Sequence, residues 1–592
     1  MNSLRYVHRA FPKAFLAVMT LVLTALALAP LSALAAGGTQ AAGTTQVEPV
    51  QNPRINMLTY PVFGCPVIVE RGESLTFTFD TTNWGTQEPV VAEDWSAMLI
   101  TSNDPIPLSL PLTVEGGWSG SGGIYEVTVD IPEIVGADSE YPSSVPEDLY
   151  DLQVTCEAGR INLVDSQPHA VKVVGGFDDD LTFINLTDTQ TGDILSVFNN
   201  LAESTPNWWP FAGTEEYWKH LRKAVDQINL IHPDMLIMSG DIVYGQLYFG
   251  EYPLEYPITH DILQGLDVPV FIAPGNHDNY VQAECDGEMY FQRYFAPLRY
   301  SFDYGPHFHF TAVDTYDWSD MERAGYCLIV STWGGQITEE QLDWLGADLT
   351  ANQGAEKIRV VFCHHSPDAP SEWADAWWNI HDNADYPYPQ LYWRLLFGLL
   401  EDQKWVGEGR QDMLDLLELY GVDLVLAGHV HYDYINYDMN PYGTDIAVTT
   451  AGCFDLTARK AYPGYRVMKI EDGEFTTLGY MDHEGIQDFY STPIYCNGYP
   501  PADNLKQQTE PAIAYSFAVP NDGSSDHNTL TVENRLLTGI PVYVEFVLPA
   551  GDYVVNNGVE LQPRSIREDK VVLYVGSSVE GEDSASISVD PM

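Results

Sequence analysis

The sequence predicts an α/β domain in the middle of the chain and a β-sandwich-like domain on either side of it, and three observations lead to this prediction. From residue 178 to 485, apolar strand-like runs alternate with amphipathic helical segments, which is typical of a sheet covered by helices. Residues 55–175 contain short segments of alternating apolar and polar side chains separated by turn residues. Residues 486–592 read as a linker followed by a second set of such segments.

The first 35 residues have the pattern of a signal peptide. Three basic residues precede an apolar run at residues 14–29, and Ala33-Leu34-Ala35 resembles a cleavage site. A retained membrane anchor would need about 20 apolar residues, and this run is shorter. We therefore expect a secreted or periplasmic protein without a stable membrane anchor, in which residues 36–54 form a linker.

The charge of the chain restricts its partners. The 592 residues include 84 Asp and Glu but only 27 Lys and Arg, a formal net charge of −57. Such a surface repels nucleic acid and anionic membranes, so we expect no nucleic-acid partner and disfavour a nuclease. The charge suits a protein exposed to high salt, although an ordinary acidic extracellular protein fits as well. A phosphate substrate would need positive charge from metal ions.

Seven cysteines in an exported chain suggest disulfides and leave at least one thiol unpaired. The pairs Cys65–Cys156 and Cys285–Cys327 are plausible because each falls within one expected domain. Cys363 lies in an apolar run and is expected to be a buried thiol.

Local signals define several elements of the three domains. Strands are expected at residues 75–79, 125–129, 542–547 and 571–575, and the glycine-rich stretch 116–123 predicts a hairpin rather than a phosphate-binding loop, since it opens no helix and contains no lysine. Helices are expected after Thr214 as N-cap, after a capping box formed by Thr338 and Gln341, and around residue 416. The apolar faces of these helices, expected in the core, comprise Trp218, Leu221, Val225 and Ile228; Leu342, Leu345 and Leu349; and Met413, Leu416, Leu417 and Tyr420.

Five apolar runs of the central domain each end in a polar cluster. The runs are residues 183–187, 235–238, 270–272, 360–363 and 424–426, and the clusters follow at 188–190, 239–241, 275–278, 364–365 and 428–431. In open α/β sheets, ligands bind at the carboxyl ends of the strands. An isolated Asp188 or Asp241 would read as a turn or cap, but a turn has no use for the His-Asp pair at 277–278. Five clusters rich in Asp, Asn and His therefore predict one metal site.

The order of these clusters resembles the calcineurin-like metallophosphoesterase superfamily over residues 180–485, with the motifs D-x-Q, G-D, G-N-H-D, H and G-H-x-H. The resemblance implies a four-layer αββα sandwich that holds two divalent metal ions bridged by one carboxylate. Carried over by motif, Asp241 would be the bridge; Asp188, Gln190 and His431 would complete one ion, and Asn276, His364 and His429 the other.

The resemblance also implies a reaction. Two such ions can hold a bridging hydroxide as nucleophile and neutralise phosphoryl oxygens. His277 would protonate the leaving oxygen, and Asp278 would orient its imidazole. The expected function is hydrolysis of small phosphate mono- or diesters, including nucleotides.

Two features depart from the simplest pattern. Gln190 stands where most of the superfamily has His, and its oxygen donor favours Mn or Mg over Zn, with Mn first and Fe also a candidate. The fourth motif offers both His364 and His365, of which His364 is favoured because it directly ends the strand.

A second class of function remains open. The chain could be a catalytically impaired extracellular binding or adhesion protein on the same scaffold, and Gln190 is the feature that favours this alternative. The six other ligand candidates favour an enzyme, and retention of metal would separate the two.

Overall fold

The structure is a computed structural model. It describes residues 56–83, 89–104, 106–135, 143–191, 215–245, 252–282, 285–326, 329–330, 332–354, 357–368, 376–377, 406–431, 434–439, 443–449, 464–476, 481–482, 485–486, 491–493, 513–535, 539–567 and 569–592. The predicted signal peptide and linker lie outside these residues. Among the helices that are described, none has both the length and the apolar character required to cross a membrane.

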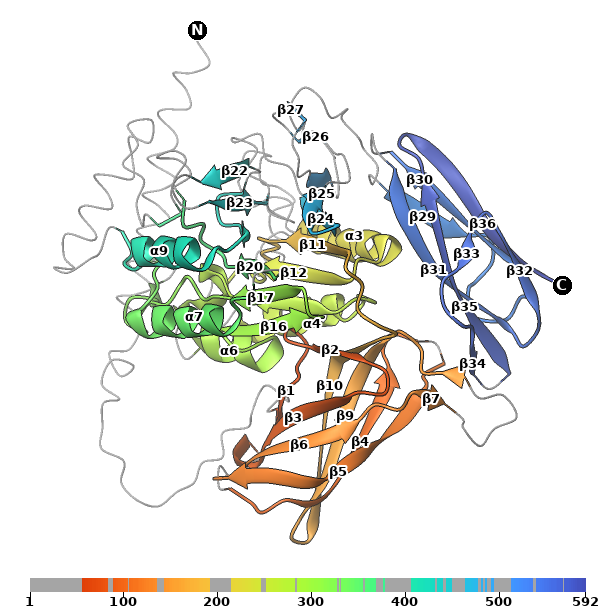
Figure 1. Ribbon diagram of the computed structural model, residues 1–592, viewed down its shortest axis with the longest axis horizontal. Helices are drawn as coiled ribbons and strands as arrows, with labels where there is room; N and C mark the ends of the chain where they lie inside the picture. The colour runs from red at the N-terminus through yellow and green to blue at the C-terminus, as the bar shows by residue number, and fades with distance from the viewer. Residues whose placement is uncertain are drawn as a thin grey trace, which may run out of the picture. The chain divides into compact units, whose positions relative to one another are not determined.

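Two sheets form the centre of the α/β region (Figure 1). The first has the order β13 (Val270–Ala273), β12 (Met235–Ser239), β11 (Leu181–Leu186), β24 (Gly464–Glu471), β25 (Glu474–Thr476), and β28 (Ser491–Pro493) also pairs with β24. The second has the order β16 (Tyr300–Tyr304), β17 (Phe308–Ala312), β20 (Ile358–Phe362), β21 (Leu424–Ala427), β23 (Thr444–Val448), β22 (Tyr434–Met439). Strands β11, β12 and β13 are parallel, as are β17, β20, β21 and β23.

Alternation along β20 shows how the layers stack. Val360 and Phe362 belong to the core that also contains strands of the first sheet. Val361 and Cys363, the residue that follows β20, belong to a separate core with the helices α7 (Glu339–Ala351) and α9 (Arg410–Tyr420). Successive side chains of a strand point to opposite faces, so the second sheet lies between the first sheet and these helices. Helices α3 (Glu215–Ile231) and α4 (Tyr252–Leu263) pack in the core that contains the strands of the first sheet. The predicted four-layer αββα fold is therefore confirmed.

The predicted helices form, with one difference in their caps. α3 begins directly after Thr214, which lies outside the described residues, and α7 has Thr338 as N-cap. The predicted capping box of α7 is wrong, since the Thr338 side chain makes no cap hydrogen bond. Its hydroxyl instead donates to Asp317, and the Gln341 amide bonds the backbone of Asp314. The side chains of Thr338 and Gln341 thus bind residues of the preceding loop instead of each other's backbone.

The shorter elements of the central region complete it. They are α5 (Asn276–Asn279), α6 (Gly287–Tyr294), and the paired short strands β14 (Val281–Gln282) with β15 (Cys285–Asp286), β18 (Gly325–Tyr326) with β19 (Ile329–Val330), and β26 (Met481–Asp482) with β27 (Gly485–Ile486).

Before the α/β region, eight strands enclose a core of their own. Their order is β1 (Leu58–Tyr60), β3 (Ser74–Asp80), β6 (Ile124–Asp130), β5 (Ser109–Ser121), β4 (Glu93–Thr101), β9 (Leu149–Ala158), β10 (Ile161–Val174), β2 (Val67–Glu70); a short pair, β7 (Ile134–Val135) and β8 (Ser143–Ser144), and a 3₁₀ turn at Thr81–Asn83 accompany them. The glycine-rich stretch forms the predicted hairpin, and the turn falls at Gly122 and Gly123, which both have positive φ angles.

The last part of the chain forms two four-stranded sheets. One has the order β29 (Ile513–Phe517), β30 (Asn528–Asn534), β36 (Asp583–Pro591), β32 (Tyr553–Asn556); the other joins β31 (Ile540–Pro549), β35 (Lys570–Val579) and β33 (Val559–Glu560), and β34 (Ser565–Arg567) also pairs with β35. The segments 542–547 and 571–575 lie in β31 and β35, which pair with each other.

The cysteines correct one prediction. Cys65 and Cys156 are free thiols, and they lie in different cores, Cys65 in the core of the α/β region and Cys156 in that of the eight-stranded sheet. The predicted Cys65–Cys156 bridge is therefore wrong. Cys327 lies outside the described residues, so its pairing with Cys285 stays a prediction. Cys363 is a buried thiol, as expected, and burial raises its pKa to about 12.

Candidate active site

The predicted site residues meet where the strands of both sheets end. Each follows the carboxyl end of β11, β12, β13, β20 or β21, and the two sheets bring these ends together. Nearly all of them are buried. Relative exposures are 0–2% for Asp188, Gln190, Asp241, Asn276, Asp278 and His364, 7% for His431 and 9% for His277.

The backbone is strained at five of the seven candidate ligands. The φ angle is positive at Asp188 (50°), Gln190 (40°), Asp241 (55°), His429 (69°) and His431 (61°). Residues other than glycine rarely adopt this conformation, and such strain concentrates at functional sites, where the surrounding structure enforces it. The strand ends are therefore shaped to aim side chains, not to make ordinary turns.

Three motif glycines allow the ligand side chains to pack closely. A Cβ atom on Gly275 would overlap the Asp241 carboxylate, and one on Gly428 would overlap the Asp188 carboxylate and the Thr187 hydroxyl. A Cβ atom on Gly240, where φ is +85°, would lie 2.7 Å from the Nδ1 atom of His364. Glycine precedes the ligand in these motifs because no other residue leaves room for the neighbouring ligand.

One group of candidate ligands comprises Asp188, Asp241 and His431, whose ligand atoms all lie within 4.8 Å of one another. The Nε2 atom of His431 is 2.9 Å from the Oδ1 atom of Asp188. Gln190 joins this group, since its Nε2 atom lies 2.9 Å from the Oδ2 atom of Asp241 and 3.3 Å from Nε2 of His431.

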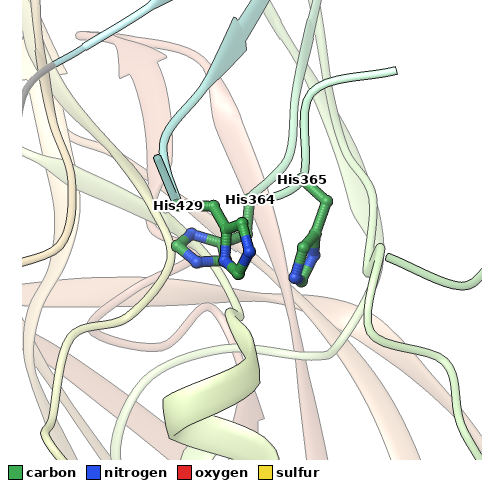
Figure 2. Close-up of side chains that lie close together, drawn as sticks. All are labelled: His364, His365 and His429. Atoms are coloured by element: carbon green, nitrogen blue, oxygen red, sulfur yellow. The ribbon is translucent and has the colours of Figure 1, made fainter. Parts of the chain in front are cut away.

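A second group comprises His364, His365 and His429, shown in Figure 2, whose ligand atoms also lie within 4.8 Å of one another. Asn276 extends it, because its Oδ1 atom is 3.0 Å from the Nδ1 atom of His429. Asp241 connects the two groups. Its Oδ2 atom, which contacts Gln190 in the first group, lies 3.1 Å from Nε2 of His364 in the second.

The two neighbouring histidines differ in what their ring nitrogens do. The Nδ1 atom of His365 is 3.1 Å from the Thr315 hydroxyl, and its Nε2 atom is 2.9 Å from the carbonyl oxygen of Trp333. Both nitrogens of His365 are thus engaged away from Asp241. In His364, Nδ1 bonds the carbonyl oxygen of Ser239 at 2.8 Å, which leaves Nε2 facing Asp241. The geometry favours His364 over His365 as a ligand.

The electrostatics and hydrogen bonding of the site fit bound cations. The Oδ1 atom of Asp188 and the Nε2 atom of His364 are buried, and the polar atoms nearest to them belong to other candidate ligands, Nε2 of His431 at 2.9 Å and Oδ2 of Asp241 at 3.1 Å. Burial alone would raise the pKa of Asp241, but the nearby His364 and His277 hold it well below its ordinary value. Burial opposes a charge on His364, yet Asp241 and Asp188 raise its pKa to about 9. The carboxylate, amide and imidazole side chains of the two groups are ligands that suit divalent metal ions.

The expected contact between Asp278 and the His277 imidazole is wrong. The Asp278 carboxylate accepts hydrogen bonds from three backbone N–H groups, those of Ile242 and Val243 at its Oδ1 atom and that of Gly275 at its Oδ2 atom. Burial and the Asp241 charge raise the pKa of Asp278 to about 7. Asp278 therefore fastens the loop after β12 to the start of α5.

A backbone carbonyl takes the role expected of Asp278. The Nδ1 atom of His277 forms a short hydrogen bond with the carbonyl oxygen of Tyr244, and the Nε2 atom lies 3.8 Å from the Oδ2 atom of Asp241. The His277 backbone N–H also donates to the Oδ1 atom of Asp241 at 2.9 Å. Backbone groups such as the carbonyls of Tyr244 and Ser239 carry no side-chain signal, so sequence patterns could not indicate them.

The candidate ligands thus lie at the strand ends of a four-layer α/β fold. Residues 181–433 match the calcineurin-like phosphoesterase family.

Individual relatives have less than 30% sequence identity to this chain. A glycerophosphodiester phosphodiesterase, GpdQ, of Enterobacter lignolyticus is 29% identical over 150 residues, 24% of this chain and 46% of the relative. Purple acid phosphatase 15 of Arabidopsis thaliana is 26% identical over 253 residues, 36% of this chain and 39% of the relative. The chain thus matches less than half the length of these two proteins. Among solved structures, a purple acid phosphatase from yellow lupin (Lupinus luteus) seeds aligns with a TM-score of 0.37 and 14% identity, covering 71% of this chain and 72% of that one.

Proposed function

We propose that this protein is a secreted phosphoesterase that hydrolyses small phosphate mono- or diesters, including nucleotides, with two divalent metal ions. The observation that carries the proposal is the position of Asp241, whose carboxylate contacts candidate ligands of both groups. The match of residues 181–433 to the calcineurin-like phosphoesterases supports the same class of reaction, and the named relatives include a phosphodiesterase and a phosphatase.

Each metal ion has its own ligands in this proposal, and Asp241 is shared. Asp188, Gln190 and His431 hold one ion, and Asn276, His364 and His429 hold the other. Two bound ions supply positive charge that neutralises phosphoryl oxygens and lowers the pKa of a water molecule. This supply matters in a chain with a net charge of −57, whose surface gives an anionic ester little attraction.

Neighbouring groups fix which atoms of the ligands are offered. The Oδ2 atom of Asp188 accepts hydrogen bonds from the Thr187 hydroxyl at 2.8 Å and from the His429 backbone N–H at 3.0 Å. The Oδ1 atom is therefore the one left for an ion. The Gln190 amide must turn to offer its oxygen, because its nitrogen faces Asp241. An oxygen ligand there favours Mn or Mg over Zn, with Mn first and Fe also a candidate.

His277 is the proposed proton donor to the leaving oxygen. The Tyr244 carbonyl accepts a hydrogen bond from Nδ1, so Nδ1 keeps its hydrogen during the proposed proton transfer. The proton that moves is then held on Nε2, the nitrogen that faces Asp241. Asp278 contributes by holding the start of α5, from which His277 projects.

The place of action is also part of the proposal. The basic, apolar and small-residue pattern of residues 1–35 supports export through a signal peptide. The excess of acidic residues is compatible with an extracellular or periplasmic setting.

The test is hydrolysis of p-nitrophenyl phosphate and bis-p-nitrophenyl phosphate by the purified chain, stripped with chelator and then resupplied separately with Mn²⁺, Mg²⁺, Zn²⁺ or Fe²⁺. Activity is expected to vanish with the chelator and to return best with Mn²⁺, and the two esters separate monoesterase from diesterase activity. A protein that retains no metal and hydrolyses neither ester would overturn the proposal in favour of a binding protein on this scaffold.

A further inference from the structure

Tyr280 lies directly behind one of the proposed metal ligands. It follows α5, the short helix that begins with Asn276, and its side chain is 1% exposed. The Nδ2 atom of Asn276 donates a hydrogen bond to the Tyr280 hydroxyl at 2.6 Å. Both side chains are buried, so water does not compete for this bond and the low local dielectric strengthens it.

This hydrogen bond determines which end of the Asn276 amide faces the site. An amide has a nitrogen that only donates and an oxygen that only accepts, and only the oxygen can ligate a metal ion. Because Tyr280 holds Nδ2, the Oδ1 atom points to the opposite side, where it lies 3.0 Å from Nδ1 of His429. His429 belongs to the same proposed ligand group.

The Tyr280 ring is held by packing that involves no ligand of the second group. It meets Tyr316 edge to face, with ring centroids 5.6 Å apart, and lies against the His277 ring at 5.4 Å. The Tyr316 hydroxyl in turn donates to the carbonyl oxygen of Thr332 at 2.8 Å. The position of the Tyr280 hydroxyl is thus set before an ion binds.

We propose that Tyr280 is a positioning residue that orients the Asn276 amide, so that its oxygen is presented to the metal ion of the second group. This inference rests on the proposed two-metal function. Without the hydroxyl the amide can rotate, and the ion must then select the correct orientation. Loss of such a supporting partner typically weakens metal binding about 10–100-fold.

The experiment is calorimetric titration of metal-stripped protein with Mn²⁺ alone. In Tyr280→Phe, which removes one oxygen atom and keeps the ring, one of the two binding steps should weaken by about 10–100-fold. The other step should change by less than about twofold, because the ligands of the first group do not contact Tyr280. Circular dichroism verifies that the variant is folded.

Tyr300→Phe is the matched control. The hydroxyl of Tyr300 is also buried and accepts from the backbone N–H of Ile272 at 2.7 Å, in the strand that leads to Asn276. Its removal disturbs the same strand without touching a ligand. Both Mn²⁺ affinities should therefore stay within about twofold of wild type.

Asn276→Asp provides a second, independent arm. A carboxylate offers an oxygen in either orientation, so the Mn²⁺ affinities of this variant are the reference for the double variant. In the Asn276→Asp background, Tyr280→Phe should change neither affinity by more than about twofold, since an oxygen faces the ion whichever carboxylate oxygen the Tyr280 hydroxyl bonds.

The outcomes separate this inference from the proposed function. Wild-type affinities in Tyr280→Phe would overturn the positioning role while leaving the two-metal site intact. An equal loss in Tyr300→Phe, or the same loss in the Asn276→Asp background, would also overturn it by showing a general structural effect. Binding of fewer than two ions by the wild-type chain would overturn the proposed function and this inference together.

Discussion

The carboxylate of Asp241 contacts candidate ligands of both groups. Its Oδ1 atom accepts the backbone N–H of His277, and its Oδ2 atom lies within 3.1 Å of atoms of both Gln190 and His364. The positive φ angle of Asp241 and the absence of a side chain on Gly275 make this position reachable. A single residue thereby couples the two proposed ion positions.

At the same scale, His277→Ala should lower kcat because the leaving oxygen loses its proton donor. A general acid contributes about 10²–10⁴-fold when the leaving group is a poor one. The loss should be smaller for p-nitrophenyl phosphate, whose leaving group needs little protonation, than for an alkyl phosphate. Kinetics with both esters, together with metal analysis, check this. Equal losses for the two esters, or loss of bound metal, would contradict the assigned role.

The neighbouring histidines provide a matched pair of variants. His364→Asn should lower the metal content by about one ion per chain, because His364 directs Nε2 toward Asp241. His365→Asn should retain both ions, since the nitrogens of His365 contact Thr315 and Trp333 instead. Elemental analysis after dialysis measures both. The opposite pattern would make His365 the ligand.

Sequence motifs were informative about these residues because metal ligation demands particular side chains in a fixed order. They were less informative about the supporting atoms. Asp278 was expected beside the His277 ring, but its carboxylate binds backbone N–H groups, and the Tyr244 carbonyl holds the ring. Any residue at 244 would present a carbonyl, so no pattern marks it.

At the scale of elements, sequence patterns located strands and helices better than the contacts between them. Burial of Leu345 and Leu349 in α7 follows from helical periodicity. The capping box failed because Asp317 and Asp314, more than 20 residues before the helical turn, compete for Thr338 and Gln341. Local propensity does not report such tertiary partners.

One buried histidine links three elements and predicts a pH dependence of stability. His309 in β17 bonds Asp303 of β16 through Nδ1 at 2.8 Å and Asp348 of α7 through Nε2 at 3.0 Å, and Lys357 also pairs with Asp303. Burial alone would lower the pKa of His309, but the two carboxylates raise it. The folded state therefore binds the proton more tightly than the unfolded state.

The sign of the effect follows from this difference in affinity. The stabilisation is fully present below the unfolded pKa of about 6.5 and is lost as the pH rises through the folded pKa. Wild type should exceed His309→Gln in free energy of unfolding by more at about pH 6 than at about pH 9. Urea titrations of both proteins measure this, and a difference that is constant or grows with pH would contradict it.

At the scale of the whole molecule, the excess of acidic residues should make stability depend on salt. With 84 acidic against 27 basic side chains, self-repulsion opposes the folded state, and added salt screens it. The thermal midpoint should rise as NaCl increases from about 0.05 to about 1 M, and more than in sucrose of equal osmolality. An unchanged or falling midpoint would show that the surface charges do not destabilise the fold.

The cysteines show what sequence could not provide at this scale. Cys65 and Cys156 fall in one expected domain, but their side chains enter different cores. A domain boundary inferred from the sequence does not indicate which hydrophobic core a particular side chain joins. The α/β class was predictable from strong strand and helix periodicities, whereas the four-layer arrangement was implied only by the resemblance that the order of the motifs carries.

The most direct test of the two-metal account is Asp241→Asn, which keeps the size of the side chain and removes its charge. Metal content, circular dichroism and hydrolysis of both nitrophenyl esters are measured on this variant and on wild type. The account predicts a folded protein that retains fewer than two ions per chain and hydrolyses neither ester. A folded variant with two ions and full activity would contradict it.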